Sequence, residues 1–432
     1  MSDATRARNL SFAKENSAFN KDWFAEVRAR VEAGEPYAYV NADVPTEIFK
    51  AMDVPVVVNQ WWASVIAAKQ KSGEYLNALN DQGYGKNLCK YCSLGLAAAM
   101  VEDADPPWGG LPRPDMLVTG NDCNGNAKIF DLMARRFDTP LFVIERSAAR
   151  APDSADWLSR ARTDWEEIFG TEAIDALVVQ YQALIRFIEE RTGRRFEIEK
   201  LRRVMDLVNE QEEYYFKTRE LIAATRPSPL NIADQMPATM IPQWHRGTEW
   251  ARDRAKLFYE ETVRKVADGE AAAANERTRL MWLGAGLWHN LSFYEYFQRE
   301  HGAAFVWSIY LSIAADAYPT YGDDPLRALA GRMTKIYNIL GVPPFNTDWF
   351  ASEAVKAGID GVVSLTGGTE DDCRDAFGYH YLVRRALERV GVPLLRLGID
   401  NVDARGWDDA AIRSRVERWL EDEVEPAKAR RM

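Results

Sequence analysis

The sequence predicts an α/β protein, with two Rossmann-like parallel-sheet domains and a helical region between them. Apolar runs of strand length alternate with helical patterns between residues 37 and 144, and the alternation returns from residue 303. Long helical patterns fill the part between. Strands that alternate with helices indicate a parallel sheet covered on both faces. We therefore expect an N-terminal α/β domain with a leading helix at 1–150, a helical region at 151–300 and a C-terminal α/β domain at 301–432.

In the first domain, apolar residues recur at every fourth position from Phe19 to Val31, so residues 1–34 are expected to be helical. Short apolar runs bounded by turn residues are typical of buried strands. The strands expected on this basis are 37–40, 55–58, 115–119 and 139–144. The helices expected between them are 47–52, 61–80, 93–102 and a helix within 121–137.

The middle of the chain carries apolar residues at spacings of three and four, as in 174–191 and 201–222. That spacing favours amphipathic helices, and we expect helix almost throughout residues 153–300. The break Arg226-Pro227-Ser228-Pro229 divides this region. Strands are expected again at 303–307, 361–365 and 392–397, before a closing helix at 408–423.

Composition excludes several classes of function. The chain has 432 residues and a net charge of −11, which argues against nucleic acid and anionic membranes as partners. No apolar run approaches the roughly 20 residues of a membrane span, and the first 20 residues lack the apolar core of a signal peptide. A cytoplasmic location is expected. Because neither a P-loop nor a Gly-x-Gly-x-x-Gly motif is present, we expect no ATP hydrolysis or nicotinamide binding in this chain.

The four cysteines stand at positions suited to binding a metal cluster. Cys89 and Cys92 form a Cys-x-x-Cys pair, whereas Cys123 and Cys373 each follow an expected strand and begin an expected helix. Ligands of open parallel sheets bind beyond the carboxyl ends of strands, and helix N-termini favour the thiolate over the thiol. We hypothesise one iron–sulfur cluster in a cleft between the domains. The alternatives are a redox pair, half of a zinc site, or buried thiols in structural turns.

The motifs that surround these cysteines also carry a resemblance to a known family. They are Asp43-Val44-Pro45-Thr46-Glu47, 83–91 (GYGKNLCKY), 115–118 leading to 121–124 (NDCN), 227–231 (PSPLN), 332–335 (RMTK), 360–363 leading to Cys373, and 398–400 (GID). Through them the chain resembles, almost end to end, the subunits of 2-hydroxyacyl-CoA dehydratases and of the related benzoyl-CoA reductases.

The resemblance implies a [4Fe–4S] cluster bound by Cys89, Cys123 and Cys373, with one iron open to substrate or water. It implies a small-molecule acyl-CoA thioester as substrate, and a related second subunit or a second copy as partner in a heterodimer or homodimer. A separate ATP-hydrolysing iron–sulfur activator would supply one electron at low potential, in anaerobic metabolism. The thioester would form a ketyl radical that loses its hydroxyl group in a dehydratase, a lyase, or gains hydrogen in an ATP-dependent acyl- or aryl-CoA reductase.

Two departures from the family bear on the reaction. Ala42 and Gln60 occupy the positions of a family serine and glutamate, and neither can exchange a proton as those groups do. Cys92 has no counterpart among the family ligands. It is either a small buried residue or a fourth ligand that would close the cluster and make it an electron carrier.

Three hypotheses follow for the function. The chain is an enzyme subunit that acts on a CoA thioester, an electron-relay subunit with the substrate site on its partner, or a zinc-bound or metal-free CoA-binding protein. Two weaker candidates stand beside the cysteines. Trp61 and Trp62 are either core residues or the wall of an aromatic acyl pocket, and His380 is either packed or near the cluster. Glu47 is expected to complement the dipole of a helix at its start.

Overall fold

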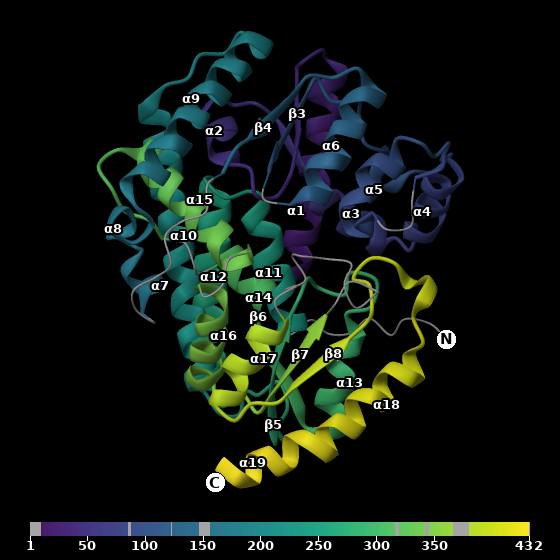
Figure 1. The fold of residues 1–432 in the computed structure, drawn as a ribbon, viewed down its shortest axis with the longest axis vertical. Coiled ribbons are helices and arrows are strands. Elements are labelled where there is room, and N and C mark those ends of the chain that lie inside the picture. The colour runs from purple at the N-terminus through teal and green to yellow at the C-terminus, as the bar shows by residue number, and fades with distance from the viewer. Residues whose placement is uncertain are drawn as a thin grey trace.

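The computed structural model of the chain describes residues 10–84, 88–121, 123–146, 156–315, 319–341, 345–365 and 380–431. The side chains at 313–315, 340–341 and 380 are outside this description. Two lobes, each built on a parallel sheet, lie one above the other in Figure 1, and helices of the middle region run along one side of both.

The first lobe contains a four-stranded parallel sheet in the order β2-β1-β3-β4. The strands are β1 (Ala38–Val40), β2 (Val56–Val58), β3 (Met116–Gly120) and β4 (Leu141–Ile144). They confirm the four strands expected from the sequence. All residues of β1 and β3 are buried, as expected for central strands with helices on both faces.

The helices of the first lobe include one that differs from expectation. The segment expected as one helix at 61–80 is two helices, α3 (Asn59–Ala68) and α4 (Ser72–Asp81). The chain turns between them at Gln70, which has a positive φ of 61° and cannot continue a helix. The other helices of this lobe are α1 (Ala13–Glu32), α2 (Thr46–Ala51), α5 (Lys90–Ala98), η1 (Pro107–Gly109) and α6 (Asn124–Phe137).

The second lobe repeats the strand order of the first, as β6-β5-β7-β8. The strands β6 (Ala303–Ser308), β7 (Gly361–Leu365) and β8 (Leu394–Leu397) confirm the expectation. The expectation of helix almost throughout 153–300 is wrong at β5 (Thr278–Leu283), which is a central strand of this sheet. Its helices are α13 (Ser292–His301), α14 (Ile309–Ala315), α15 (Pro325–Gly341), α16 (Phe345–Lys356), α17 (His380–Arg389), η2 (Ala404–Gly406), α18 (Asp409–Trp419), η3 (Leu420–Val424) and α19 (Glu425–Arg431).

The middle region consists of helices that connect the two lobes. They are α7 (Trp157–Arg160), α8 (Trp165–Phe169), α9 (Thr171–Thr192), α10 (Ile198–Ala224), α11 (Ile232–Trp244) and α12 (Glu249–Ala267). The 27-residue helix α10 packs against α2 of the first lobe, α12 of the middle region and α15 of the second lobe. Elements of both lobes therefore pack against the same helix, α10.

A buried ion network lies where these helices meet. Glu47 is fully buried, and its Oε1 lies 2.7 Å from Arg246 Nε and 3.1 Å from Arg332 NH1. Arg332 also pairs with the buried Glu212 on α10 at 2.6 Å. The positive charges of Arg246 and Arg332 outweigh the effect of burial and lower the pKa of Glu47. Glu47 thus has a structural role across three helices, beyond its place in the first turn of α2.

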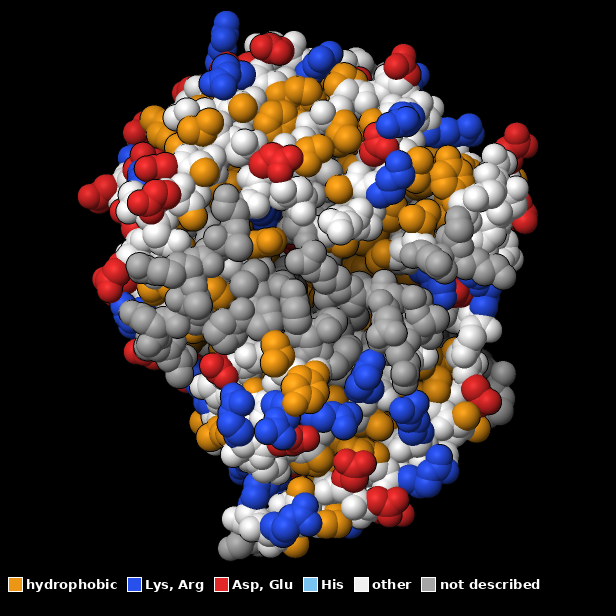
Figure 2. Space-filling model, in the orientation of Figure 1, with side chains coloured by type: hydrophobic (Ala, Val, Ile, Leu, Met, Phe, Trp, Pro, Cys, Tyr) orange, Lys and Arg blue, Asp and Glu red, His pale blue; other side chains and the backbone are white. Residues whose placement is uncertain are grey.

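The surface charge is unevenly distributed. Figure 2 shows Lys and Arg side chains gathered over the lower part of the visible face, where α17 lies in Figure 1. Arg384, Arg385 and Arg389 of α17 are exposed, and so are Tyr381 and Leu382 on the same helix. Among the described residues, no helix is long and apolar enough to cross a membrane.

Candidate functional site

The candidate site lies at the carboxyl ends of the strands, where cysteines begin two helices of the first lobe. Cys89 is the N-cap residue of α5, and its Sγ accepts a hydrogen bond from the backbone N–H of Cys92 at 3.5 Å. Cys123 follows β3 and is the N-cap residue of α6. Free N–H groups and the positive end of the helix dipole favour a thiolate at such positions.

Gly125, in the first turn of α6, lies next to both cysteines. A Cβ atom at this glycine would lie 3.6 Å from Cys123 Sγ and 3.9 Å from Cys89 Cβ. Both cysteines therefore lie close to a position that carries no side chain. Soft thiolate ligands at helix N-termini are the donors that an iron–sulfur cluster uses.

Cys92 is buried and contacts the first two residues of α3, Asn59 and Gln60. Its side chain is 6% exposed, and its Sγ accepts a hydrogen bond from Gln60 Nε2 at 3.9 Å. Its carbonyl oxygen accepts from Asn59 Nδ2 at 3.0 Å, and Asn59 in turn accepts from the hydroxyl group of Tyr39 at 2.7 Å. A role of Cys92 as a fourth ligand stays a prediction.

Cys373 and the residues around it, 366–379, lie outside the described residues, and so does the side chain of His380. In the sequence Cys373 follows β7, which is the third strand of the second sheet, as Cys123 follows the third strand of the first. Within the described part of the chain, no group of three His, Cys, Asp or Glu residues is placed to hold a metal ion. The ligand set of three cysteines therefore stays a prediction.

Ala42 and Gln60 are in direct contact beside the cysteines. Gln60 Oε1 accepts a hydrogen bond from the backbone N–H of Ala42 at 2.9 Å, and Gln60 Nε2 donates to Asn41 Oδ1 at 2.5 Å. Gln60 is 7% exposed. Its amide thus connects the loop after β1 to the start of α3, and it also contacts Cys92. The two positions that depart from the family pattern belong to the same site as the Cys-x-x-Cys segment.

The two residues between Cys89 and Cys92 connect the site to the second lobe. The hydroxyl group of Tyr91 lies 2.7 Å from that of Tyr310, which stands at the start of α14 just after β6. Lys90 Nζ lies 3.3 Å from Asp403 and 4.0 Å from Asp400, both after β8. These contacts could not be predicted from the sequence, because nothing in a Cys-x-x-Cys motif indicates the partners of its middle residues.

The pKa values of the two aspartates near Lys90 are shifted in opposite directions. Burial raises the pKa of Asp400. Burial also acts to raise the pKa of Asp403, but hydrogen bonds from the side chain and backbone of Arg405 prevail and lower it to about 2. Burial, followed by the neighbouring Tyr310, raises the pKa of Tyr91. Tyr91 is therefore a neutral hydroxyl group at neutral pH, and Asp403 is a carboxylate.

Fold and site together define a class: a two-lobed α/β protein with thiols at the strand ends where its lobes meet. The model of the family "2-hydroxyglutaryl-CoA dehydratase, D-component" matches residues 41–422. The chain belongs to this family. It is a subunit of a 2-hydroxyacyl-CoA dehydratase-like enzyme, and the resemblance found in the sequence is confirmed.

Characterised relatives cover most of the chain. It is 23% identical to the (R)-2-hydroxyisocaproyl-CoA dehydratase alpha subunit of Clostridioides difficile, over 95% of this chain and 97% of that protein. It is 22% identical to the (R)-phenyllactyl-CoA dehydratase alpha subunit of Clostridium sporogenes, over 89% of each chain. It is also 22% identical to the lactoyl-CoA dehydratase subunit alpha of Anaerotignum propionicum, over 72% of each chain.

Proposed function

We propose that this chain is the [4Fe–4S]-binding subunit of an enzyme that removes water from a 2-hydroxyacyl-CoA thioester. The observation that carries the proposal is the pair Cys89 and Cys123, which cap two helix N-termini and both lie next to the side-chain-free position of Gly125. Cys89, Cys123 and Cys373 would hold the cluster. When bound, such a cluster supplies one-electron chemistry.

In the proposed reaction one electron enters the thioester carbonyl group to form a ketyl radical, which expels the 2-hydroxyl group. Loss of a proton from the neighbouring carbon and return of the electron complete the net loss of one water. A separate ATP-hydrolysing activator would supply the electron, and a second subunit would complete the enzyme. The relatives named as alpha subunits support a partner subunit.

The residues of this chain would orient and enclose the reacting group. Lys90 and Tyr91 hold the cysteine segment against the second lobe, so the site is shaped by both sheets. The half-buried hydroxyl groups of Tyr91 and Tyr310 are neutral donors at this junction. Gln60 holds the loop after β1 and lies next to Cys92.

A second candidate function is electron relay, with the substrate site on the partner subunit. The contact between Gln60 and Ala42 favours it, because both positions lack the acid and hydroxyl groups of the family pattern. The two functions differ in one respect that can be measured. An ester that binds beside the cluster of this chain changes the electron paramagnetic resonance signal of the cluster. The signal of a relay cluster, which is remote from the ester, stays the same.

The test is electron paramagnetic resonance on anaerobically purified, reduced protein, together with iron and sulfide analysis. We expect about four iron atoms per chain and a signal that shifts with acyl-CoA. Cys123→Ser should lose the signal, whereas the matched Cys92→Ser should keep iron content and spectrum. Loss of iron in Cys92→Ser would show a fourth ligand. A signal indifferent to every ester would favour the relay, and zinc or no metal in place of iron would overturn both functions.

A further inference from the structure

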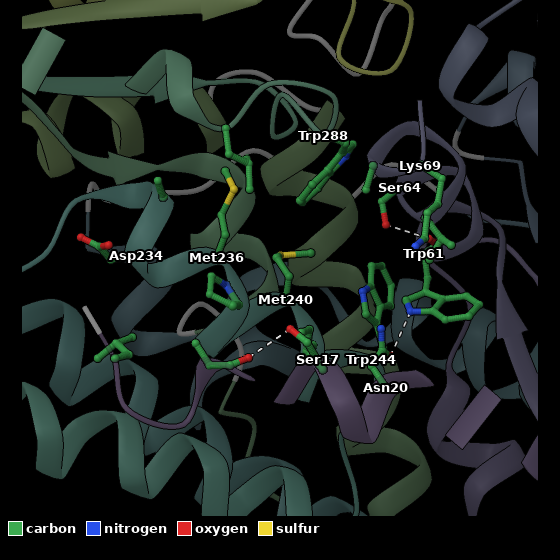
Figure 3. Close-up of a pocket in the computed structure, with 18 of the residues that line it drawn as sticks. Ser17, Asn20, Trp61, Ser64, Lys69, Asp234, Met236, Met240, Trp244 and Trp288 are labelled. Atoms are coloured by element: carbon green, nitrogen blue, oxygen red, sulfur yellow. Dashed lines mark hydrogen bonds between the residues drawn. The ribbon is translucent and has the colours of Figure 1, made fainter. Parts of the chain in front are cut away.

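A cavity of about 490 Å³ lies beside the candidate site, between α1, α3, α11 and the loop before α13. Its size falls within the usual range for small-molecule sites. Figure 3 shows Trp61, Trp244 and Trp288 around the cavity, with Met236 and Met240 on the side opposite Trp61. Trp108 completes the aromatic lining. Trp61 therefore lines the cavity, whereas Trp62 is fully buried in the core.

Three of the polar side chains on the cavity wall are engaged with the protein itself, and the carboxylates of Asp234 and Glu295 also line the cavity. Ser64 Oγ donates to the carbonyl oxygen of Trp61 at 2.7 Å, and Ser17 Oγ donates to that of Ala13 at 3.0 Å (Figure 3). Asn20 Oδ1 accepts from Trp61 Nε1 at 3.1 Å. These groups already have partners, so the wall they form recognises a guest through apolar and aromatic surface.

The cavity and the cysteine site share walls. Trp61 directly follows Gln60, whose amide contacts Cys92. On the other side, the ring of Trp288 packs edge-on against Tyr310 at 5.4 Å between centroids, and the hydroxyl group of Tyr310 lies 2.7 Å from that of Tyr91. One layer of side chains thus separates the cavity from the segment that carries Cys89 and Cys92.

We propose that this cavity holds the acyl group of the CoA thioester, and that it selects aryl or branched aliphatic groups. The inference rests on the proposed function and names its substrate class. Indole rings and methionines gain most from burying a large apolar group, and such a group fits a cavity of this volume. A methyl group would leave the cavity largely unfilled, and a second carboxylate on the guest would lose its hydration against the apolar wall.

The rim of the cavity carries a positive charge, in contrast to the apolar wall inside. Lys69, at the end of α3, lines the cavity and is exposed to solvent. A cation at the rim suits the phosphate groups of CoA, which remain in solvent when the acyl group enters. The guest would thus be apolar inside the cavity and anionic at its rim.

The test is calorimetric titration of the anaerobic protein with acetyl-, 4-methylpentanoyl-, 3-phenylpropanoyl- and glutaryl-CoA. We expect the phenyl and branched esters to bind at least about tenfold more tightly than the acetyl and glutaryl esters. Val65→Phe adds a ring to the cavity wall, since Val65 lines it. It should remove most of this preference, because the ring fills space that the phenyl and branched groups would occupy. The control is Val179→Phe, at a position that is 59% exposed on α9.

A second variant enlarges the cavity where the first one fills it. It keeps the proposal testable if the first variant does not fold. Met240→Ala enlarges the cavity and should shift the preference toward esters larger than phenylpropanoyl, such as naphthylpropanoyl-CoA. Equal ester preference in wild type and both variants, with a cluster signal that still responds to ester, would overturn the cavity assignment and leave the proposed function standing. Failure of every ester to bind would overturn both.

Discussion

The side chain of Gln60 is bound to the backbone of Ala42, through a 2.9 Å hydrogen bond from the Ala42 N–H to Gln60 Oε1. Gln60 Nε2 donates to Asn41 Oδ1 and to Cys92 Sγ. The glutamine is therefore a neutral group that uses both ends of its amide. A carboxylate at this position has two acceptor oxygens and no donor, so it cannot reproduce the same contacts.

Gln60→Glu should destabilise the protein at neutral pH by about 1–3 kcal/mol, the usual cost of leaving buried polar groups without partners. Protonation of the buried carboxyl group restores a donor, so the loss should shrink as the pH falls toward 5. Denaturant unfolding at pH 7.5 and pH 5 measures both effects. Gln182→Glu is the control, because Gln182 is exposed on α9 and should show neither effect. Equal stability of wild type and Gln60→Glu at pH 7.5 would contradict the argument.

Gly125→Ala should have opposite effects on stability and on iron content. In the first turn of α6, alanine is favoured over glycine, and the new Cβ finds ordinary contacts at 3.6 Å and 3.9 Å. The metal-free protein should become more stable by about 0.5–1 kcal/mol. Because the methyl group would lie within 4 Å of both Cys89 Cβ and Cys123 Sγ, it should crowd a cluster held there and lower the iron content.

Thermal unfolding of metal-free protein and iron analysis of anaerobically purified protein measure these two effects. Gly406→Ala is the control, since a Cβ there meets no atom within 4 Å. Unchanged iron content in Gly125→Ala would show that the cluster does not lie between these two cysteines.

Tyr91 and Tyr310 should be energetically coupled across the two lobes. Each phenylalanine variant removes one hydroxyl group of a 2.7 Å hydrogen bond and leaves the other without that partner. We expect each single variant to lose about 1–2 kcal/mol of stability, and the double variant to lose less than the sum by about 1 kcal/mol. A double-mutant cycle from denaturant unfolding gives the coupling energy. Additive losses would mean that the hydroxyl groups contribute independently.

Asp403→Asn should show how the carboxylate next to Lys90 contributes to stability as a function of pH. The pKa of Asp403 is lowered to about 2 in the fold, so its stabilising effect is complete above its unfolded pKa of about 3.9 and is lost as the pH falls through 2. The variant should be less stable than wild type by about 1 kcal/mol at pH 7, allowing for solvent screening. Urea unfolding at pH 7, 4 and 2.5 should show the difference shrinking, and a constant difference would refute it.

His245 should make the fold sensitive to mild acid. It is 3% exposed between the rings of Phe19, Trp23 and Trp250, and burial, with the charge of Lys50, holds its pKa well below 6.5. The unfolded chain takes up a proton below about pH 6.5 while the fold does not. Stability should therefore fall with decreasing pH by up to about 1.4 kcal/mol per unit. His245→Gln removes this slope, and stability curves of equal slope for both proteins between pH 6.5 and 5 would contradict it.

Local patterns were sufficient for seven of the eight described strands and for the helix that begins at Cys123, whereas α5 starts at Lys90, three residues before the helix expected at 93–102. A short apolar run between turn residues indicates a buried strand. The residue that follows the strand lies at the carboxyl edge of the sheet, independently of distant parts of the chain. The strand β5 was missed because its apolar run, 280–283, is short, follows Arg279 and cannot be told from a buried helical segment by periodicity alone. This arginine is 1% exposed, and its charge is met by Glu276 and by backbone carbonyl groups, which only the folded chain supplies.

The sequence by itself determined the family, the parallel sheets and the cysteines at strand ends, because these depend on neighbouring residues and on spacing. Only the tertiary structure decided which groups meet at the site. Tyr91 contacts Tyr310, Lys90 contacts Asp403, and Gln60 turns its amide to Ala42. The first two contacts join residues more than 200 positions apart. Their partners are set by the packing of two lobes on α10, and packing of distant segments leaves no periodic pattern in a sequence.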